Sequence, residues 1–508
     1  MNIKSLVAKP YANMVCSKIH KGMETALEDQ QTIFKQLIKA AKDTRFGKDH
    51  HFHSIGSYEN FVSKVPIRDY EELKPYIDKI REGQENVLWK GKPLYLAKTS
   101  GTTSGTKYIP ITRDSIDNHI QTARNALLCY IAEKGNADFT SGKMIFLSGS
   151  PVLERVGGIP TGRLSGIVNH HIPVYLKGNQ LPRYETNCIE DWETKLDKIV
   201  EETVHQNMTL ISGIPPWMQM YFDKIIEKTG RKVGEVFPNF NLMVQGGVNF
   251  EPYKNKLFES IGRKVDTIEL FPASEGFFAF QDSQKQPGLL LNTNSGIFFE
   301  FVPAGEIMNE NPTRLNLSQV EKDVNYALII NSNAGLWGYN LGDTIKFVSL
   351  NPYRIVVSGR IKHFISAFGE HVIGEEIEKA IMTAMQEEKV GVTEFTVAPM
   401  VQQGEGKSYH EWFIEFESIP ENIDRFAQRI DDDLRKRNSY YDDLIKGNIL
   451  QPLKIRPVKK NAFIDYMKSI GKLGGQNKLP RLSNDRKIAD ALQPYLVSRA
   501  VSGENGNR

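Results

Sequence analysis

The residues best suited to chemistry lie in one short segment, residues 99–112, with the sequence TSGTTSGTKYIPIT. It begins with Thr, Ser and Gly only, continues with Lys107, and ends in a run typical of a β-strand. Glycine lets the backbone approach a ligand closely, hydroxyl groups add hydrogen-bond donors, and consecutive amides can form an anion-binding concavity. A lysine supplies charge for a phosphate. The composition therefore predicts a loop that binds a triphosphate; a flexible turn between strands is the alternative.

This segment matches neither of two common nucleotide-binding loops. In a Walker A loop, Gly-Lys-Ser/Thr follows a glycine and four further residues, but Thr106 stands five residues after Gly101 and Tyr108 follows the lysine. The glycine spacing of a dinucleotide-binding fingerprint is also missing here. A P-loop NTPase is therefore disfavoured.

The elements that would position the loop follow from the hydrophobic pattern. Residues 1–90 show apolar positions three or four residues apart, which predicts helices. From about 94 to 350, helical segments alternate with short β-type runs, which predicts an α/β domain with layered, largely parallel sheets. Ligands bind beyond the carboxyl ends of such strands, so Gly246 and Ser274, where two runs end, are expected near a ligand.

A domain boundary is predicted near Gly359, where a strand passes through a glycine into another strand and a helix. The runs that follow suggest a small α+β domain. We therefore expect a large N-terminal α/β domain, residues 1–358, and a small C-terminal domain, residues 359–508.

Composition limits the possible partners and location. The chain has 508 residues, with 64 Lys plus Arg against 61 Asp plus Glu, so it has no strong charge that would favour nucleic acid or an anionic membrane. Cys16, Cys129 and Cys188 are widely spaced and form no CxxC pair, which is typical of a reducing compartment. The chain has no apolar run long enough to span a membrane. We expect a cytoplasmic protein that binds small molecules.

Four further segments, taken in order with the loop, point to one superfamily. VQGG is similar to an adenine-binding Gly-Gly stretch, FPASEG to an aromatic-x-x-Ser/Thr-Glu segment, YNLGD to a ribose-binding Gly-Asp, and SGRIKHFISAFGEHVIGEEIE to a hinge followed by a Glu-rich helix start. Together with residues 99–107 they resemble the adenylate-forming superfamily, which includes acyl-CoA synthetases and luciferases.

The closest resemblance within that superfamily is to the Gretchen Hagen auxin-responsive family of acyl acid amido synthetases, in its bacterial branch. It is carried by TRFGKDHHFHSIGSYENFVSKVPIRDYEELKPYI, RKRNSYYDDLI and GGQNKLPRL, and it extends over roughly residues 30–495. The resemblance implies a large adenylate-forming domain that binds ATP and the acyl acid, and a small C-terminal domain that is mobile.

The implied reaction uses ATP and Mg²⁺ to adenylate a carboxylic acid and then transfers the acyl group to an amine, most simply an amino acid, with release of pyrophosphate and AMP. Two alternatives stay open. The acceptor could be coenzyme A or another thiol, or the chain could be a nucleotide-binding regulatory protein without chemistry. The identity of the acid does not follow from the sequence.

The resemblance also implies roles for individual residues. Glu275 would hold Mg²⁺, because a hard divalent cation prefers carboxylate oxygen. Asp343 would accept hydrogen bonds from the ribose, although it could simply form a Gly-Asp turn. The residues that would hold the phosphates are Ser100, Gly101, Thr102, Thr103 and Lys107.

Adenine would lie against the backbone of Gly246 and Gly247 and the ring of Phe271, although an aromatic residue at a strand end is often part of the core. Arg360, beside the hinge, would contact ribose or phosphate. Lys478 is the candidate for a mobile-domain lysine that reaches the active site, and the alternative is that its segment only covers the domain surface.

Three further groups of residues have open or weak functional interpretations. Plant relatives carry a hinge-region lysine near the position of His371, and either His371 or Lys362 could take its place. The neighbouring His50, His51 and His53 lack a regular ligand spacing, so we do not expect a metal there. Trp217, Phe298 and Arg124 could contact the acyl acid, although for Trp217 a buried place in the core is the safer interpretation.

Overall fold

The computed structural model describes residues 3–100, 106–172, 177–247, 250–361, 364–365, 372–401, 408–446, 450–473, 479–483 and 485–497. The chain forms two compact units; the first extends to Ser358 and the second begins at Gly359. No helix among the described residues is long and apolar enough to cross a membrane.

The first unit contains an eleven-stranded sheet. Its strands, in spatial order, are β12 (Ile297–Pro303), β13 (Asn325–Ser332), β14 (Tyr339–Leu350), β15 (Tyr353–Arg360), β11 (Leu289–Leu291), β10 (Gly276–Phe280), β9 (Asp266–Ala273), β8 (Leu242–Gly246), β7 (Met208–Gly213), β3 (Lys143–Phe146) and β6 (Gln180–Leu181). From β9 to β6 the neighbouring strands are parallel. Their carboxyl ends therefore lie along one edge of the sheet.

The expectation of largely parallel sheets is wrong for the other half of this sheet. The pairs β9–β10, β10–β11, β11–β15, β12–β13 and β13–β14 are antiparallel. The reason is the length of the connections. Only Ser274 and Glu275 separate β9 from β10, and a turn that short can only form a hairpin, whereas parallel strands need a long crossover.

A second, four-stranded sheet of the first unit carries the hydroxyl-rich segment. Its order is β2 (Thr106–Ile111), β1 (Tyr95–Ser100), β5 (Ile159–Arg163) and β4 (Glu154–Val156). Strands β1 and β2 are antiparallel, with Thr99 opposite Lys107 and Ser100 opposite Thr106. The predicted phosphate loop is therefore the connection of a hairpin, and Lys107 is the second residue of its second strand.

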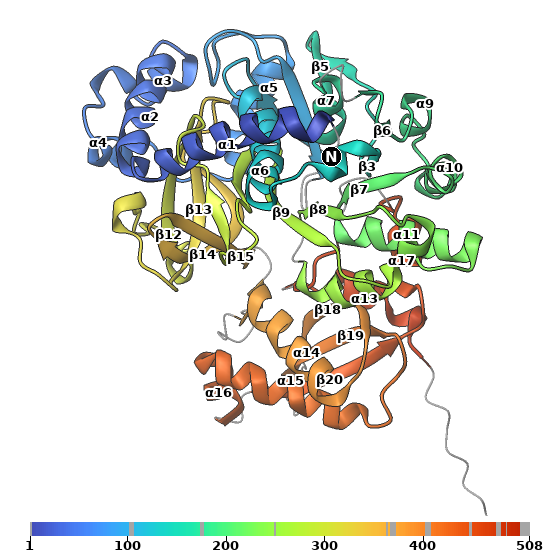
Figure 1. The fold of residues 1–508 in the computed structure, drawn as a ribbon. Helices are drawn as coiled ribbons and strands as arrows, with labels where there is room; N and C mark the ends of the chain where they lie inside the picture. Colours follow the sequence, from blue (N-terminus) through green and yellow to red (C-terminus); the bar gives the residue numbers. More distant parts are fainter. Residues whose placement is uncertain are drawn as a thin grey trace, which may run out of the picture. The chain divides into compact units, whose positions relative to one another are not determined.

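Helices surround these sheets in the first unit (Figure 1). They are α1 (Ile3–Met23), α2 (Ala26–Ala41), α3 (Arg45–Asp49), α4 (Tyr58–Lys64), α5 (Tyr70–Arg81), α6 (Ile116–Lys134), α7 (Leu164–His170), α9 (Tyr184–Asn187), α10 (Trp192–Thr203), α11 (Pro215–Thr229), α12 (Val233–Val236) and α13 (Glu251–Ile261). The start of α5 is fixed by a capping box, in which Asp69 and Glu72 each accept a hydrogen bond from the other's backbone amide. Its residues Tyr70, Leu73 and Ile77 are buried on one face.

Helix α6 is joined to the β9–β10 hairpin through Asn118. The Asn118 side-chain amide donates to the backbone oxygen of Phe277 at 3.0 Å, and its oxygen accepts from the Phe277 amide at 2.6 Å. The register of β9 and β10 shifts between Phe277 and Ala279, so a helix side chain completes the backbone hydrogen bonding where the strand pairing is irregular. The helix that follows the hydroxyl-rich hairpin is thus bonded to the strand that follows Glu275.

The second unit is a small α+β domain. Its sheet consists of β18 (Val392–Met400), β19 (Ser408–Phe416) and β20 (Leu450–Val458), and its longest helices are α14 (Gly374–Glu388) and α15 (Ile423–Arg437), which pack on each other (Figure 1). Residues 479–483, which follow Lys478, are anchored on β18. Val397 donates its amide hydrogen to the oxygen of Arg481, and the Arg481 guanidinium pairs with Glu378 and Glu394.

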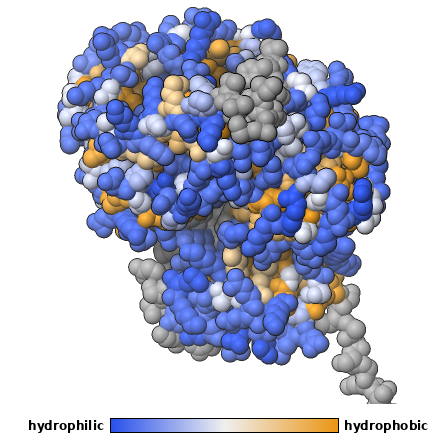
Figure 2. Space-filling view, in the orientation of Figure 1, coloured by the Kyte–Doolittle hydropathy of each residue, from blue (hydrophilic) through white to orange (hydrophobic). Residues whose placement is uncertain are grey.

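Figure 2 shows a mostly hydrophilic face on which hydrophobic residues appear in separate groups. The large hydrophobic residues that are exposed, such as Met14, Val152 and Met308, are far apart in the sequence and in different elements or loops. Isolated apolar residues of this kind are normal on a protein surface.

A buried ion pair fixes the edge of the large sheet. Glu300 on β12 is fully buried; its carboxylate accepts from the Arg314 guanidinium at 3.0 and 2.7 Å and from the Tyr58 hydroxyl at 2.8 Å. The Asn331 amide on β13 donates to the same carboxylate at 2.8 Å. Burial raises the pKa of Tyr58, and the Glu300 carboxylate raises it further. The side chains of Arg314, Tyr58 and Asn331 therefore all depend on the Glu300 carboxylate for a hydrogen-bond partner.

Replacing Arg314 by Met is expected to destabilise the first unit by about 3–5 kcal/mol, because the Glu300 carboxylate would stay buried without its cation. Urea unfolding followed by tryptophan fluorescence measures the change. Lys198→Met, which removes an exposed partner of Glu201, is the control and should leave the urea midpoint unchanged. Equal midpoints for the two variants would contradict the prediction.

Candidate active site

The candidate site is centred on Glu275, in the turn between β9 and β10. The Tyr339 hydroxyl, at the start of β14, donates to Glu275 Oε1 at 3.1 Å. Burial raises the pKa of Glu275, the nearby Lys107 ammonium and the Tyr339 hydrogen bond oppose this, and the Asp343 carboxylate adds to it. The structure therefore brings Lys107, Glu275 and Asp343, from three separate segments, close to one another.

The position of Tyr339 is set by backbone geometry around Gly338. Gly338 has φ +56°, and a Cβ there would lie 2.5 Å from the Pro66 oxygen, so only glycine fits. The Gly338 amide donates to the Asn331 side-chain oxygen, and its carbonyl accepts from the Arg68 amide at 2.8 Å. The residue before the tyrosine is thus held from two sides, which aims the Tyr339 side chain at Glu275.

Lys107 reaches the site from β2. Its Nζ lies 5.4 Å from the centre of the Tyr70 ring, and the Tyr70 hydroxyl accepts from the amide of Tyr108 at 2.9 Å. A cation above an aromatic ring is attracted to it, so Tyr70 helps to hold the lysine stem. The lysine that the sequence singled out is therefore placed by the first residue of α5.

Two consecutive glycines, Gly246 and Gly247, stand at the end of β8. A Cβ on Gly246 would lie 2.4 Å from the Leu270 oxygen, and Gly247 has φ +84°. Phe271 is buried, and its ring makes an edge contact with Phe278 at 5.2 Å between ring centres. That contact fits the core alternative for Phe271, and its contact with adenine stays a prediction.

Several predicted residues cannot be placed relative to this centre. Gly101, Thr102, Thr103 and Lys478 lie outside the described residues, as do Lys362 and His371. For Ser100 and Arg360 the structure describes the backbone, at the ends of β1 and β15, and not the side chain. Their roles stay predictions.

Two tyrosines of the site were given no role in the sequence analysis. Tyr339 stands in the YNLGD segment, but nothing in that segment alone shows that its hydroxyl meets Glu275, which is 64 residues earlier. Tyr70 lies in the helical N-terminal part, where its spacing with Leu73 and Ile77 indicates only a buried helix face. The signal that could have found Tyr339 is its position next to a glycine at the start of the strand that carries Asp343.

The other candidate residues fit structural roles. Trp217 is buried against Trp192, with 4.6 Å between ring centres, and Phe298 is part of the core. His50 lies between the Phe46 oxygen at 2.9 Å and the Arg68 guanidinium at 2.8 Å. Within the described part of the chain, no group of three His, Cys, Asp or Glu side chains could hold a metal ion.

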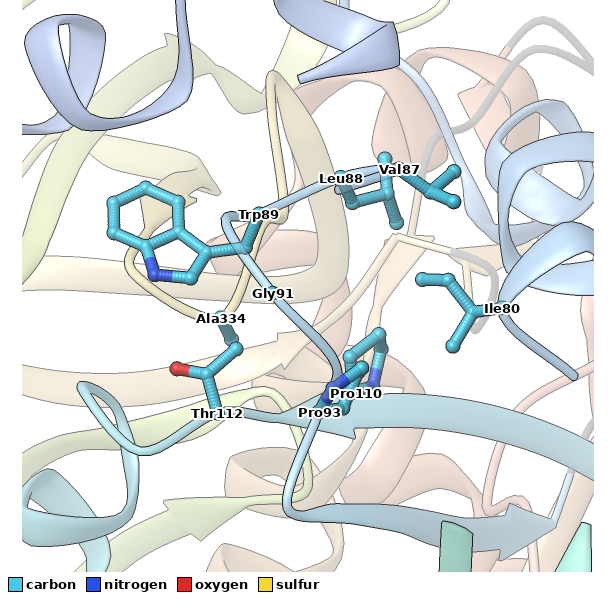
Figure 3. A pocket seen from close by; sticks show the side chains of 9 residues that line it. All are labelled: Ile80, Val87, Leu88, Trp89, Gly91, Pro93, Pro110, Thr112 and Ala334. Atoms are coloured by element: carbon cyan, nitrogen blue, oxygen red, sulfur yellow. The ribbon is translucent and has the colours of Figure 1, made fainter. Parts of the chain in front are cut away.

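Figure 3 shows a small cavity between the end of β2 and the segment before β1. Its volume of about 10 Å³ is enough for about one water molecule, and its lining is mainly apolar, with Trp89, Leu88 and Pro110 around it. The Thr112 hydroxyl at its rim donates to the Asn333 oxygen at 2.7 Å. A cavity of this size does not accommodate a nucleotide or an acyl acid.

Comparison with known families agrees with this geometry. The chain matches the GH3 family N-terminal domain over residues 15–183, the GH3 family central domain over residues 290–360 and the GH3 family C-terminal domain over residues 375–487. The chain belongs to the GH3 family. The N-terminal match contains Lys107, and the central match contains Tyr339 and Asp343.

Individual relatives of this GH3 protein are distant but similar over nearly the full length. Jasmonoyl--L-amino acid synthetase JAR6 from Nicotiana attenuata is 21% identical over 98% of this chain and 99% of its own. Indole-3-acetic acid-amido synthetase GH3.3 from Arabidopsis thaliana is 21% identical over 93% of this chain and 92% of its own.

Two solved structures show the same fold. AtGH3.15 acyl acid amido synthetase in complex with 2,4-DB has a TM-score of 0.77 at 16% identity and covers 95% of this chain and 96% of its own. 2-Hydroxyisobutyryl-CoA ligase in the postadenylation state with 2-HIB-AMP has a TM-score of 0.55 at 12% identity, covering 94% and 90%. The predicted α/β fold with a large N-terminal and a smaller C-terminal domain is confirmed.

Next to Gly246 of this GH3 protein stands the buried Gln245 on β8, which lies opposite the partly buried Glu269 on β9. Burial raises the pKa of Glu269 to about 7, and the nearby Glu251 carboxylate adds to the rise, while a hydrogen bond from Gln245 opposes it. Glu269 therefore holds a proton over a pH range in which an unfolded chain would have lost it.

This proton should make stability depend on pH. The folded-state pKa of Glu269 lies above the ordinary value, so its contribution is fully present below pH 4.5 and is lost as the pH rises to about 7. The loss is at most roughly 3 kcal/mol. Urea unfolding at pH 5, 6, 7 and 8 is expected to show a smaller fall in stability for Glu269→Gln than for the wild type. Parallel curves for the two proteins would refute this assignment.

Proposed function

We propose that this chain is an acyl acid amido synthetase, a ligase that uses ATP to adenylate a carboxylic acid and then transfers the acyl group to an amino acid. The observation that carries the proposal is that the Lys107 ammonium and the Asp343 carboxylate both act electrostatically on Glu275 in a member of the GH3 family. The names of the curated relatives, which join jasmonate or indole-3-acetic acid to amino acids, support the amine as acceptor.

The reaction has two steps. First, a carboxylate oxygen of the acid attacks the α-phosphorus of ATP, the bond to the bridging oxygen breaks, and pyrophosphate leaves with its electron pair. Second, the amine nitrogen attacks the acyl carbon, AMP leaves with the acyl–oxygen electron pair, and the nitrogen gives up a proton. The first step brings two anions together, so neutralising charge and fixing the line of attack should supply most of the catalysis.

Lys107 is proposed to neutralise phosphate charge during the first step. It follows directly on the hydroxyl-rich segment, and its ammonium lies near the Glu275 carboxylate at the end of β9. Ser100, whose backbone ends β1 opposite Thr106, is proposed to begin the phosphate-binding loop. Asp343 is proposed to accept hydrogen bonds from the ribose, four residues after the tyrosine that contacts Glu275.

Glu275 is proposed to hold Mg²⁺. The donor set fits this ion, because Mg²⁺ in nucleotide sites takes one or two carboxylates and completes its shell with water and substrate phosphates. One glutamate with a second carboxylate nearby, and no larger acidic cluster in the described part of the chain, is such a set. When bound, the ion would stabilise charge on the phosphoryl oxygens. The Tyr339 hydroxyl would fix which oxygen of Glu275 stays free.

Adenine is proposed to lie along Gly246 and Gly247, because these two glycines stand at the carboxyl end of β8, where ligands of parallel sheets bind. The remaining predicted contacts, from Gly101, Thr102, Thr103, Phe271, Arg360 and Lys478, are kept as proposals, as are the mobility of the C-terminal domain and a cytoplasmic location.

Replacing Glu275 by Gln should lower the rate of pyrophosphate release by about a hundredfold or more, because a neutral amide binds Mg²⁺ poorly. The assay is product analysis with Mg-ATP, pooled carboxylic acids and pooled amino acids. Asp266→Asn, at the start of β9, is the matched control, since Asp266 also accepts from a tyrosine hydroxyl and pairs with a lysine. The proposal fails if wild-type protein that binds ATP forms no AMP and pyrophosphate with any acid.

Removing only the Tyr339 hydroxyl should also impair the reaction, but less than Glu275→Gln does. Tyr339→Phe keeps the buried ring but frees Glu275 Oε1, so we expect the KM for Mg-ATP to rise about tenfold or somewhat more, corresponding to one lost hydrogen bond to a charged group. Tyr130→Phe, which removes the hydroxyl bonded to Asp266, is the control and should leave this KM unchanged. An unchanged KM in Tyr339→Phe would exclude the positioning role.

The same assay separates the two possible acceptors. Mass spectrometry of the product formed with amino acids and coenzyme A together should show an amide and no thioester. A thioester alone would leave the adenylation proposal standing and change the acceptor.

A further inference from the structure

Two basic side chains that the proposed reaction does not use meet at the loop after β3. Lys195, in the first turn of α10, is 2% exposed, and its Nζ donates to the backbone oxygens of Ser148 and Asn187, both at 2.8 Å. A lysine buried this deeply is unusual unless it is paired or has a function. Here its partners are neutral carbonyl groups.

Arg163, at the end of β5, approaches the same loop. A Cβ on Gly149 would lie 2.7 Å from Arg163 Cδ and 3.6 Å from its Nε, so the arginine stem runs directly over this glycine. The Gly149 amide donates to the Ser165 hydroxyl at 3.2 Å, which fixes the loop beneath it. Lys195 thus contacts residue 148, and Arg163 lies over residue 149, the next residue of the same loop.

The two cations lack a close acidic partner among the described residues. The Glu190 carboxylate raises the pKa of Arg163, but the two side chains do not form an ion pair. Burial lowers the pKa of both groups, and burial together with the charge of Arg163 lowers the pKa of Lys195 to about 8. Two like charges held together in a partly desolvated place are costly, and an anion that binds there would relieve that cost.

The pair lies on the same edge of the large sheet as Glu275. Strands β9, β8, β7 and β3 are neighbours and parallel, so the loop after β3 is three strand spacings, about 14 Å, from the end of β9. Arg163 is also opposite Lys98 in the parallel pair β1–β5, two residues before Ser100. A ligand at Arg163 would therefore be close to substrates at Glu275 without sharing its position.

We propose that Arg163, supported by Lys195, forms an oxyanion subsite that binds a carboxylate or phosphate group of a substrate at a distance from the reacting atoms. The planar guanidinium suits either group, because it can donate two parallel hydrogen bonds. The inference rests on the proposed function for its location. Partly buried Arg163 makes the contact, whereas Lys195 lies beneath it, holds the loop and adds positive potential. Because β3 lies three strands to the side of β9, this position favours the carboxylate of the amino acid acceptor over the nucleotide phosphates.

The test compares Arg163→Gln with Arg155→Gln in the full-length protein. Arg155 is on β4 of the same small sheet and donates to the Gly158 oxygen in its own hairpin, so it is a matched control. Binding of pooled L-amino acids is measured by equilibrium dialysis with mass spectrometry, and binding of sodium pyrophosphate by calorimetry. Arg163→Gln is expected to weaken the binding of one of the two probes by about ten- to hundredfold, as for the loss of a charge-assisted hydrogen-bonded pair.

Kinetics then identify the source of the anion. If it is the acceptor carboxylate, Arg163→Gln raises the KM for amino acids and leaves the KM for the corresponding amino acid amides and for ATP unchanged. If it is phosphate, the KM for ATP and inhibition by pyrophosphate change instead. Either result supports the subsite. Equal behaviour of Arg163→Gln and Arg155→Gln with every probe, or no binding of either probe to the wild type, overturns it.

Lys195→Met provides a second variant, with the exposed Lys198→Met one turn along α10 as its control. Lys195→Met should weaken the binding of the same probe as Arg163→Gln does. If Lys195→Met instead weakened the binding of the other probe, the two residues would not share a subsite. Because the binding measurements need no turnover, a protein that forms no amide but binds an anion through Arg163 would refute the proposed function and keep the subsite.

Discussion

The structure around the candidate site depends on one constraint, which is the partial burial of the Glu275 carboxyl group at a two-residue strand turn. A buried carboxylate is costly unless hydrogen bonds and positive charge compensate it. Tyr339 supplies the hydrogen bond and Lys107 the charge, and both come from segments distant in the sequence. The three segments must therefore fold together, so the arrangement proposed for phosphate chemistry is also a condition of the fold.

The support for this arrangement continues outward through the antiparallel half of the sheet. The fully buried Glu300 carboxylate binds the Asn331 amide, and the Asn331 oxygen in turn accepts from Gly338, next to Tyr339. Arg314 neutralises Glu300. A series of satisfied polar groups thus connects the sheet edge with the candidate site. Such networks define a unique geometry because a partly satisfied network would be unfavourable in a low dielectric.

The sequence was informative where function depends on local pattern. Lys107, Glu275 and Asp343 could be singled out because each follows directly from a short motif, and the α/β class from alternating runs. The antiparallel strands were missed because hairpin turns such as Ser274–Glu275 carry no Asn-Gly signal. Tyr70 and Arg163 could not be found, because a contact between distant segments leaves no trace in spacing. Residues 101–105 and Lys478 remain predictions of the sequence alone.

The two hydrogen bonds between Asn118 and Phe277 link a helix to an irregular strand pair. An asparagine side chain has the donor and acceptor of a peptide group, so it can form with Phe277 the two hydrogen bonds that a neighbouring strand would otherwise form. The irregularity in β10 and the residue on α6 therefore form one energetic unit. Because both bonds reach backbone atoms of residue 277, they do not depend on the Phe277 side chain, and position 118 must keep an asparagine for as long as β10 keeps its irregular path.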